Sequence, residues 1–499
     1  MSDTAHSPQP ETGQDAVIAF LASPAAHGGV TPEHIETHLS HIFLAGDRVL
    51  KLKKARHWSV VDYSTVAQRA HYCRKELELN ARIAPAIYLA VRPITNTNGL
   101  ALGGAGEPVD WVVVMRRFPE DAQLDAMVDA GTITPALIDG TADAIAALHR
   151  TVPVRRQRGY ADRVRALAGQ LEHDVAERVA PPLRDDVTAW AQGTGAQIER
   201  LAGRLDARGR HGFVRHCHGD LHLSNICLWE GKPTPFDALE FDDEMATVDI
   251  LHDLAFVLVD LEHRGRGDLS VRLLSRYLEW TRDYAGLALL PLFKGLRSMV
   301  RALVGVTKGR DPAPAIAAAL AAATWTADPR IIAIGGRSGT GKTTVARALA
   351  PRLGAVVIRS DTTRKHLAGV SPETALPATA YTAGQTRQVY RRMRVDAARA
   401  LRAGWPVILD ATFMEETERG GVRALADAHG APFAGVWLEA PAETLAARIA
   451  ARTGDASDAD VRVVHAQHAR DVGTLDWTVL GAEAAAQTLA ATIAGHRDG

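Results

Sequence analysis

The spacing of apolar residues divides this chain of 499 residues into two regions with different patterns. In the first region, apolar and polar residues alternate as in strands that bury one face. These segments are 37–44, 48–53, 87–94 and 111–115. A turn at 45–47, a helix over 65–83 and helical spacing through about 120–210 complete the pattern. Strands followed by helices in this order predict an N-terminal part with two lobes.

The second region contains short apolar runs separated by helical and turn segments, as in a buried parallel sheet flanked by helices. The runs are 331–334, 356–358, 407–410 and 436–438. Proline and glycine at 308–314 and 327–330 bracket an alanine-rich segment and indicate a boundary. The chain is therefore expected to be a multidomain protein of α/β and α+β class. Its predicted parts are a disordered start at 1–15, a domain at 16–310, a linker at 311–328 and a domain at 329–499.

Charge and cysteine content exclude several classes of partner. The 57 Lys and Arg residues balance 58 Asp and Glu residues, so no global basic field attracts nucleic acid or anionic membrane. The cysteines Cys73, Cys217 and Cys227 lack the spacing of a disulfide framework or a zinc site. No secretory leader and no apolar run of about 18 residues is present. We expect a cytoplasmic protein without a membrane partner, and the oligomeric state stays open.

A glycine-rich segment between the run at 331–334 and the helical stretch at 345–350 has the spacing G-x-x-x-x-G-K-T. Its residues are Gly336, Arg337, Ser338, Gly339, Thr340, Gly341, Lys342, Thr343 and Thr344. Strand, glycine-rich loop and helix in this order form a phosphate cradle lined by backbone N–H groups. Lys342 is expected to reach the β- and γ-phosphates, and Thr343 is expected to hold Mg²⁺. The segment therefore predicts a P-loop that binds a nucleoside triphosphate.

A second phosphate-transfer pattern occurs at His218-Gly-Asp220-Leu-His-Leu-Ser-Asn225. The Asp-to-Asn spacing equals that of the kinase catalytic loop, in which the aspartate accepts the proton of a substrate hydroxyl. Asn225 is then a metal ligand. A hairpin-like segment follows and returns the chain at Asp237, which is expected to lie beside Asn225 and supply the second Mg²⁺ ligand.

With these residues in place, the first 310 or so residues resemble the aminoglycoside phosphotransferase-like branch of the protein-kinase fold. The resemblance implies ATP or GTP bound between two lobes. It makes Lys51 the strand lysine that grips the phosphates and Glu76 the helix glutamate that orients it. Lys53 lies on the same strand face and is the alternative lysine, whereas Glu78 lies on a different helix face. Asp249 and Asp253 match aspartates that usually support the catalytic loop.

Two departures from the kinase pattern limit the resemblance. Only one glycine, Gly46, stands in the turn before Lys51, so a glycine-rich phosphate loop of the protein-kinase type is not evident. After Asp237 the sequence continues with Glu240 and Asp242 instead of Phe-Gly. These two carboxylates either add to the metal site, contact a cationic substrate, or belong to an acidic surface.

Acidic and basic residues follow the later apolar runs of the C-terminal region, where ligands bind in open α/β sheets. Asp361 is placed to deprotonate an acceptor hydroxyl, and Arg364, one helical turn later, to hold an acidic group of the acceptor. Asp410 ends the run at 407–410 and is a candidate Mg²⁺ partner of the P-loop. Arg448 and Arg452 lie four residues apart and share a helical face that could close over phosphates.

This set resembles the P-loop kinases of the gluconate, shikimate and polynucleotide 5′-kinase group. The spacing from Asp361 to Arg364 and from Arg448 to Arg452 is most similar to that of the 5′-hydroxyl polynucleotide kinase domain. The resemblance implies that Asp361 is the general base and that Arg364 binds a phosphate of the acceptor. It also implies that Arg452 acts on the donor, with Arg448 nearer the nucleotide.

Together these patterns predict an ATP-dependent phosphotransferase with two nucleotide sites, each using Mg²⁺ and ATP or GTP. The acceptor is a hydroxyl of a small molecule or the 5′-hydroxyl of a nucleic acid. One alternative is a P-loop kinase regulated by a catalytically weak, kinase-like sensor domain. Another is a C-terminal nucleotide switch without an acceptor.

Overall fold

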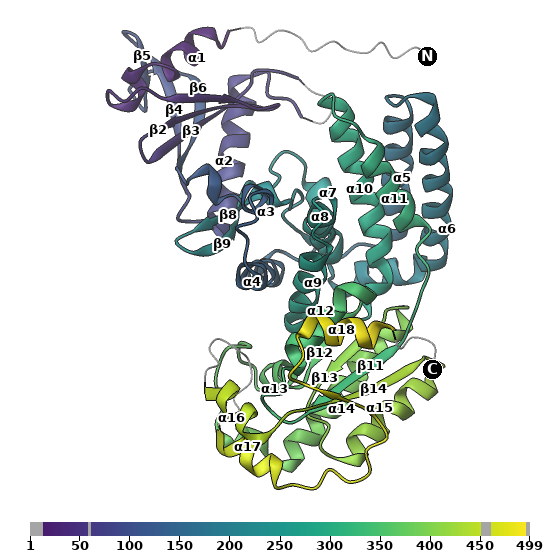
Figure 1. The fold of residues 1–499 in the computed structure, drawn as a ribbon. Coiled ribbons are helices and arrows are strands. Elements are labelled where there is room, and N and C mark those ends of the chain that lie inside the picture. Colours follow the sequence, from purple (N-terminus) through teal and green to yellow (C-terminus); the bar gives the residue numbers. More distant parts are fainter. Residues whose placement is uncertain (1–12, 58–60, 451–460, 496–499) are drawn as a thin grey trace. The chain divides into compact units, whose positions relative to one another are not determined.

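The computed structural model describes residues 13–57, 61–450 and 461–495, and it divides into two compact units (Figure 1). The first unit comprises residues 1–160 and 206–257, and the second comprises residues 161–205 and 258–499. Most of the N-terminal segment predicted to be disordered lies outside the described residues. Within the described residues, no helix is long and apolar enough to cross a membrane.

An antiparallel sheet of six strands in the order β1-β2-β3-β6-β4-β5 begins the first unit. The strands are β1 (Glu33–Glu36), β2 (Ser40–Ala45), β3 (Arg48–Lys53), β4 (Tyr88–Asn96), β5 (Leu100–Leu102) and β6 (Pro108–Arg116). Side chains alternate across this sheet. Val113 therefore packs with Cys73 of helix α2 (Val66–Ile83), whereas Val112 packs with Leu21 of helix α1 (Asp15–Leu21). The predicted strands and the predicted helix at 65–83 agree with these elements.

Helices and two short sheets form the rest of the first unit. Strands β8 (Ile226–Trp229) and β9 (Lys232–Pro235) make a hairpin, and β7 (Val214–His216) pairs with β10 (Thr247–Asp249). The helical elements are η2 (Glu120–Ala122), α3 (Leu124–Asp129), α4 (Pro135–Thr151), η3 (Leu223–Asn225) and α7 (Asp243–Ala246), followed by the first part of α8 (Ile250–His263). The segment with the kinase-loop spacing ends in η3, and the hairpin follows directly after it.

The second unit contains a parallel sheet of five strands in the order β12-β13-β11-β14-β15. The strands are β11 (Ile331–Gly336), β12 (Val356–Arg359), β13 (Val407–Asp410), β14 (Phe433–Glu439) and β15 (Thr478–Gly481). The surrounding helices are α12 (Lys342–Leu353), α13 (Ser360–Leu367), α14 (Ala383–Arg402), α15 (Glu416–Ala428), α16 (Ala442–Ala450), α17 (Val461–His468) and α18 (Ala486–Gly495). Short hydrophobic strands separated by helices are typical of this architecture. This sheet flanked by helices is the P-loop NTPase arrangement that the sequence predicts.

Several helices that precede the parallel sheet in the chain belong to the same unit, and α9 (Gly267–Thr281) among them packs directly on strand β12. These helices are α9, η4 (Gly286–Leu289), α10 (Leu290–Thr307) and α11 (Ala313–Ala323), together with α5 (Tyr160–Ala176) and most of α6 (Pro181–His211). Val271 of α9 packs on the core that Val357 and Val345 share, and the Ser275 hydroxyl accepts the Val357 N–H at 3.3 Å. Helix α11 lies in the segment predicted to be a linker, and its Ile316 is fully buried.

Candidate active sites

The catalytic-loop segment of the first unit brings Asp220 and Asn225 into contact. Asn225 is the last residue of η3, directly before β8, and its side-chain amide donates to Asp220 twice. The distances are 2.9 Å to the backbone carbonyl of Asp220 and 3.2 Å to its Oδ2 atom. Asp220 is half-buried, so its carboxylate can meet a ligand from solvent. The structure therefore brings the predicted base and one predicted metal ligand together.

Asp253 of α8 supports this loop through its backbone. Its carboxylate accepts the N–H of Gly219 at 2.9 Å and the N–H of His218 at 3.2 Å. Gly219 has φ +83°, and a Cβ atom there would lie 3.2 Å from the backbone of Ala246, so a glycine is required. Asp249 has a different role, because its carboxylate forms a buried pair with Arg208 at 2.5 and 2.8 Å. Both aspartates are thus structural, and only Asp253 bonds to the loop itself.

The β8–β9 hairpin returns the chain so that Asp237 follows directly beside Asn225. The N–H of Phe236 donates to the carbonyl of Asn225 at 2.9 Å, which ties the two segments together. Asp237 has φ +62°, a left-handed conformation that is uncommon outside glycine. The strained backbone turns its carboxylate toward Lys51, whose Nζ atom lies 2.6 Å from Asp237 Oδ1.

Lys51 and Lys53 both contact Glu76, so the structure joins the two lysines between which the sequence left a choice. The Nζ atoms of Lys51 and Lys53 lie 2.9 and 2.6 Å from the two oxygens of Glu76. Lys53 also contacts Glu240 at 2.5 Å, and Glu240 accepts the hydroxyl of Tyr63 at 2.8 Å. Glu240 is therefore a buried partner of Lys53, not part of an acidic surface. The sequence offers no local pattern that links it to Tyr63.

Burial and opposite charges together set the pKa values of this cluster. Burial disfavours the charge on Glu76, but Lys51 and Lys53 outweigh it and lower the pKa of Glu76 to about 2. Burial likewise opposes the charge on Lys51, but the carboxylates of Asp237 and Glu76 hold its pKa well above the ordinary value. The lysines and Glu76 are thus charged at neutral pH. Asp242 lies apart from them and accepts the N–H of Glu244 at 2.8 Å at the start of α7.

The oxygen donors of this unit fit the magnesium that kinase chemistry uses. Asp237 supplies a carboxylate and Asn225 an amide oxygen, and hard oxygen ligands are those that Mg²⁺ prefers. The side chain of Asp237 is 36% exposed, which leaves room for phosphate oxygens to complete the coordination. The residues present therefore suit the metal.

The glycine-rich loop of the second unit connects β11 to α12 in a conformation that requires glycine. Gly336, Gly339 and Gly341 have φ values of +135°, +89° and +81°. A Cβ atom on Gly336 would lie 2.5 Å from the carbonyl oxygen of Leu438, so the loop also tolerates no side chain there. Helix α12 begins at Lys342. The backbone N–H groups of its first turn have no partner within the helix, and they point toward the loop. The Lys342 ammonium donates to the carbonyl of Arg337 at 2.8 Å.

Thr343 and Asp410 meet at the edge of the parallel sheet. The Thr343 hydroxyl donates to Asp410 Oδ2 at 2.6 Å, and Asp410 is the last residue of β13 and only 4% exposed. A hydroxyl and a carboxylate oxygen are the donors that a P-loop uses for Mg²⁺. The structure brings these two predicted ligands together, and they suit this metal.

The predicted acceptor residues lie on α13, which follows β12 without a loop. Asp361 is in the first turn of this helix and half-buried. Arg364 is buried, donates to the carbonyl of Ala380 at 2.7 Å, and lies 4.6 Å from the centre of the Tyr381 ring. The segment η5 (Ala378–Tyr381) therefore covers the Arg364 side chain.

The structure describes only one of the two predicted lid arginines. Helix α16 meets the P-loop, because a Cβ atom on Gly339 would lie 2.9 Å from the carbonyl of Leu445. Arg448 lies one turn further along this helix and is exposed. Arg452 lies outside the described residues. The sequence did not identify Gln467 of α17, whose side-chain oxygen accepts the N–H of Ser338 at 2.8 Å and whose carbonyl accepts Arg337 at 3.1 Å.

Glu418 of α15 lies behind the end of β13 in a hydrogen-bonded group with Tyr390. The Tyr390 hydroxyl lies 3.3 Å from Thr412 Oγ1 and accepts the N–H of Phe413 at 2.9 Å. Burial raises the pKa of Glu418 to about 7, against the opposing effects of Tyr390 and Arg419. This carboxyl group consequently changes charge near neutral pH.

A pH dependence of stability follows from Glu418. Its folded-state pKa lies above its ordinary value of 4.5, so the free energy of unfolding should fall as the pH rises from about 4.5 to about 7. Glu418→Gln is expected to remove about 1–2 kcal/mol of this fall, because the group is only partly buried. Denaturant unfolding between pH 4.5 and 8 measures it. Exposed Glu443→Gln is the control, and equal pH profiles for the two variants would contradict the assignment.

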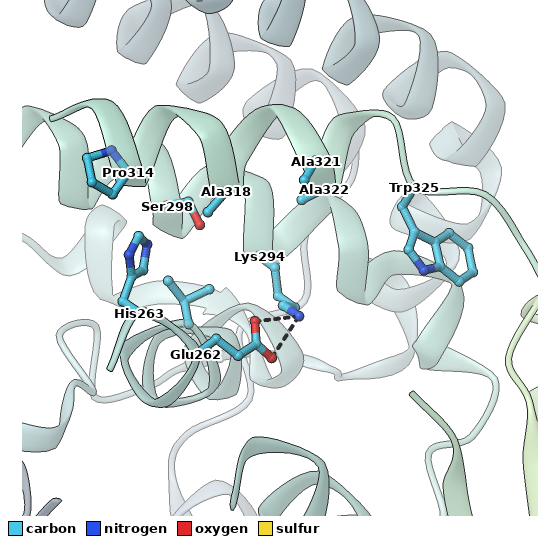
Figure 2. Close-up of a pocket in the computed structure, with 10 residues that line it drawn as sticks. Glu262, His263, Lys294, Ser298, Pro314, Ala318, Ala321, Ala322 and Trp325 are labelled. Atoms are coloured by element: carbon cyan, nitrogen blue, oxygen red, sulfur yellow. Dashed lines mark hydrogen bonds and ion pairs between the residues drawn. The ribbon is translucent and has the colours of Figure 1, made fainter. Parts of the chain in front are cut away.

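A cavity of about 460 Å³ in the second unit contains none of the predicted site residues. It lies among α8, α10 and α11, and Figure 2 shows Lys294 and Glu262 joined across one side of it. The Lys294 Nζ atom is 2.7 Å from Glu262 Oε2. Alanines of α11 and the ring of Trp325 line the opposite side. None of the residues that line this cavity belongs to either of the two predicted phosphate sites.

Models of known protein families match both halves of the chain. Residues 45–290 match the phosphotransferase enzyme family, and residues 331–471 match an AAA domain. The protein is thus a kinase-class enzyme in which a kinase-like domain precedes a P-loop domain. It belongs to the same family as the uncharacterised protein Rv2004c of Mycobacterium tuberculosis. The two are 32% identical over 465 residues, which cover 89% of this chain and 90% of the relative.

Solved structures similar to each half include two kinases. A choline kinase from Cryptosporidium parvum is 10% identical, with a TM-score of 0.37, over 59% of this chain and 88% of its own. A gluconokinase from Sinorhizobium meliloti is 21% identical, with a TM-score of 0.25, over 34% of this chain and 95% of its own.

Proposed function

We propose that the protein is a phosphotransferase with two nucleotide sites, one in a domain at 16–310 and one in a domain at 329–499. Each site transfers the γ-phosphoryl group of ATP, or of GTP in its place, to a hydroxyl acceptor. The observation that supports this is the same in both units. A lysine stands beside the oxygen ligands that a nucleotide-bound metal needs. Lys51 contacts Asp237. Lys342 bonds within the P-loop next to Thr343, whose hydroxyl contacts Asp410.

In the N-terminal site, Asp220 accepts the proton of the acceptor hydroxyl while the hydroxyl oxygen attacks the γ-phosphorus. The bond from that phosphorus to the bridging oxygen breaks, which yields a phosphate ester and the nucleoside diphosphate. Lys51, oriented by Glu76, pairs with the donor phosphates. Asn225 and Asp237 are the residues that would hold Mg²⁺, which neutralises phosphate charge when bound.

In the C-terminal site, the P-loop N–H groups and Lys342 bind the donor phosphates, and Thr343 with Asp410 would hold Mg²⁺. Asp361 accepts the proton of the acceptor hydroxyl. Arg364 contacts an acidic or phosphate group of the acceptor after its present contacts with Ala380 and Tyr381 break. Arg448 and Arg452 act over the donor phosphates as the lid.

The acceptor classes that these residues suit are hydroxyl-bearing small molecules for either site and a nucleic-acid 5′-hydroxyl for the C-terminal site. Arg364 favours an acceptor that carries an anionic group beside its hydroxyl. Cys73, Cys217 and Cys227 are buried and form no disulfide, as in proteins of a reducing cytoplasm, where we place the enzyme.

Single-site variants of the full chain test the two-site proposal. Nucleotide consumption and labelled phosphate transfer are measured with Lys342→Ala, Asp220→Asn and the double variant, against a panel of sugars, nucleosides and oligonucleotides. Each single variant is expected to lose transfer to one group of acceptors, and the double variant to lose both. Exposed Lys308→Ala and Asp427→Asn serve as controls for the charge changes.

Two results would contradict parts of the proposal. If neither single variant changes consumption with any acceptor, the protein does not use these sites. If Asp220→Asn loses no transfer to any acceptor, while Lys342→Ala does lose transfer, the N-terminal domain is a sensor. The weak glycine content before Lys51, with only Gly46 in the turn, is the feature that favours this second candidate.

A further inference from the structure

Arg359 is a buried cation placed against both predicted metal ligands of the P-loop. It is the last residue of β12 and is 3% exposed. Its Nη2 atom lies 3.3 Å from Thr343 Oγ1, and its Nε atom lies 3.5 Å from Asp410 Oδ2. These two oxygens are themselves 2.6 Å apart. One guanidinium therefore contacts the two atoms that would coordinate Mg²⁺.

The register of the sheet fixes this arrangement. Arg359 and Asp410 are paired neighbours on the parallel strands β12 and β13, and each is the last residue of its strand. Asp410 is 4% exposed, and a buried carboxylate is costly unless a cation or hydrogen bonds compensate it. Arg359 supplies that compensating charge.

The same contacts oppose a metal ion. A divalent cation bound at Thr343 and Asp410 would lie within a few ångströms of the guanidinium, and like charges at such distances repel strongly in a buried site. Two protein oxygens alone are also few ligands for Mg²⁺, which is normally bound by one or two carboxylates together with substrate phosphates. Phosphate oxygens would attract the guanidinium as well as the metal, so a nucleotide relieves this conflict.

We propose that Arg359 is a positioning residue of the P-loop metal site. Its guanidinium holds Asp410 and Thr343 in place before the substrate arrives, and it keeps free divalent metal out until a nucleoside triphosphate brings the metal with it. The inference rests on the proposed metal role of Thr343 and Asp410. It assigns to Arg359 a contact with phosphate oxygens in the loaded site.

Binding of Mn²⁺ to the full chain without nucleotide tests this role. Paramagnetic resonance counts free Mn²⁺ during titration of the wild type, Arg359→Gln and Arg359→Lys. The glutamine variant is expected to bind one Mn²⁺ about tenfold or more tighter than the wild type, because the opposing charge is gone. The lysine variant keeps the charge and should stay close to the wild type. Arg402→Gln, an exposed arginine of α14, is the charge-matched control.

Further variants separate this site from the N-terminal one. Asp410→Asn in the Arg359→Gln background should abolish the extra Mn²⁺ site, while binding by Asn225 and Asp237 persists. Arg359→Met makes the same comparison if the glutamine variant does not fold, as judged by thermal unfolding. Equal Mn²⁺ affinity of the charge-removed variant and the wild type would overturn the inference.

The proposed function fails in a different way. If Asp410→Asn does not weaken Mn²⁺ binding in the presence of a non-hydrolysable ATP analogue, the P-loop does not use these metal ligands. If it does weaken that binding while Arg359→Gln behaves like Arg402→Gln, the metal site is sound and only the role of Arg359 is wrong.

Discussion

Lys53→Met is expected to destabilise the protein by about 3–5 kcal/mol, whereas Lys51→Met chiefly weakens nucleotide binding. Lys53 is 1% exposed and holds two buried carboxylates, those of Glu76 and Glu240. Its removal leaves three carboxylates in the cluster against Lys51 alone, with Glu240 dependent on the Tyr63 hydroxyl. Unpaired buried charge of this kind is among the most destabilising changes known in proteins.

Lys51 differs from Lys53 in its exposure and in its second partner. Its side chain is 13% exposed, and Asp237, which it contacts, is 36% exposed and belongs to the predicted metal site. Lys51 is therefore the lysine that donor phosphates can reach. Denaturant unfolding and titration with a non-hydrolysable ATP analogue separate the two effects. Lys342→Ala is included as background so that the analogue reports on the N-terminal site, and exposed Lys232→Met is the stability control.

Acid unfolding gives an independent check on Lys53. The pKa of Glu76 is lowered from 4.5 to about 2, so its contribution to stability is present above about pH 4.5 and is lost as the pH falls toward 2. Without Lys53 the pKa of Glu76 should rise, and the loss should begin at higher pH than in the wild type. Equal stabilities of Lys53→Met and Lys51→Met at pH 7 would contradict the division of roles.

The choice between these lysines shows where sequence patterns stop. Strand alternation predicts that Lys51 and Lys53 share a face, and the structure places both on Glu76. A period of two cannot show which of them is covered, because burial depends on Tyr63 and Glu240 from distant segments. The hairpin that returns Asp237 to Asn225 was predictable, since turn residues and strand pattern are local.

The contacts that the sequence did not indicate join residues on separate elements. Arg359 reads as the polar end of a short strand, and only the register of β12 against β13 brings it to Asp410. Gln467 reads as a solvent-facing helix residue, yet it accepts a P-loop N–H. Likewise, apolar periodicity shows that α9 buries one face but not that it packs on β12 through Ser275. Periodicity reports the existence of a buried face, whereas the partner depends on the tertiary fold.

Asp396→Asn is expected to cost about 3–5 kcal/mol in the full chain, because this buried carboxylate is the shared partner of three arginines, of which Arg282 is itself buried. Asp396 of α14 is fully buried. It contacts Arg282 through Nε at 3.0 Å, Arg392 at 2.9 Å and Arg399 at 3.4 Å. Arg282 is itself 5% exposed, so neutralising Asp396 leaves a buried guanidinium without its main counter-charge. Asp427→Asn, at an exposed position of α15, is the matched control.

The same substitution tests whether the helices before the parallel sheet belong to its folding unit. Arg282 ends α9 in a left-handed conformation with φ +54°, and it lies in the region that matches the phosphotransferase family. Its Nη2 atom also donates to the hydroxyl of Thr363 at 3.1 Å, and Thr363 lies on α13 between Asp361 and Arg364. Loss of Asp396 should thus loosen the helix that carries the proposed acceptor residues.

Hydrogen exchange of the intact protein distinguishes this coupling from a local defect in α14. Amide protection is expected to fall together in α9, α13 and α14, while the P-loop helix α12 changes less. A single cooperative transition at lower denaturant concentration should accompany it. If protection falls only in α14, or if Asp396→Asn unfolds like the control, α9 and the sheet do not act as one unit. In that case the acceptor helix is held by the P-loop domain alone.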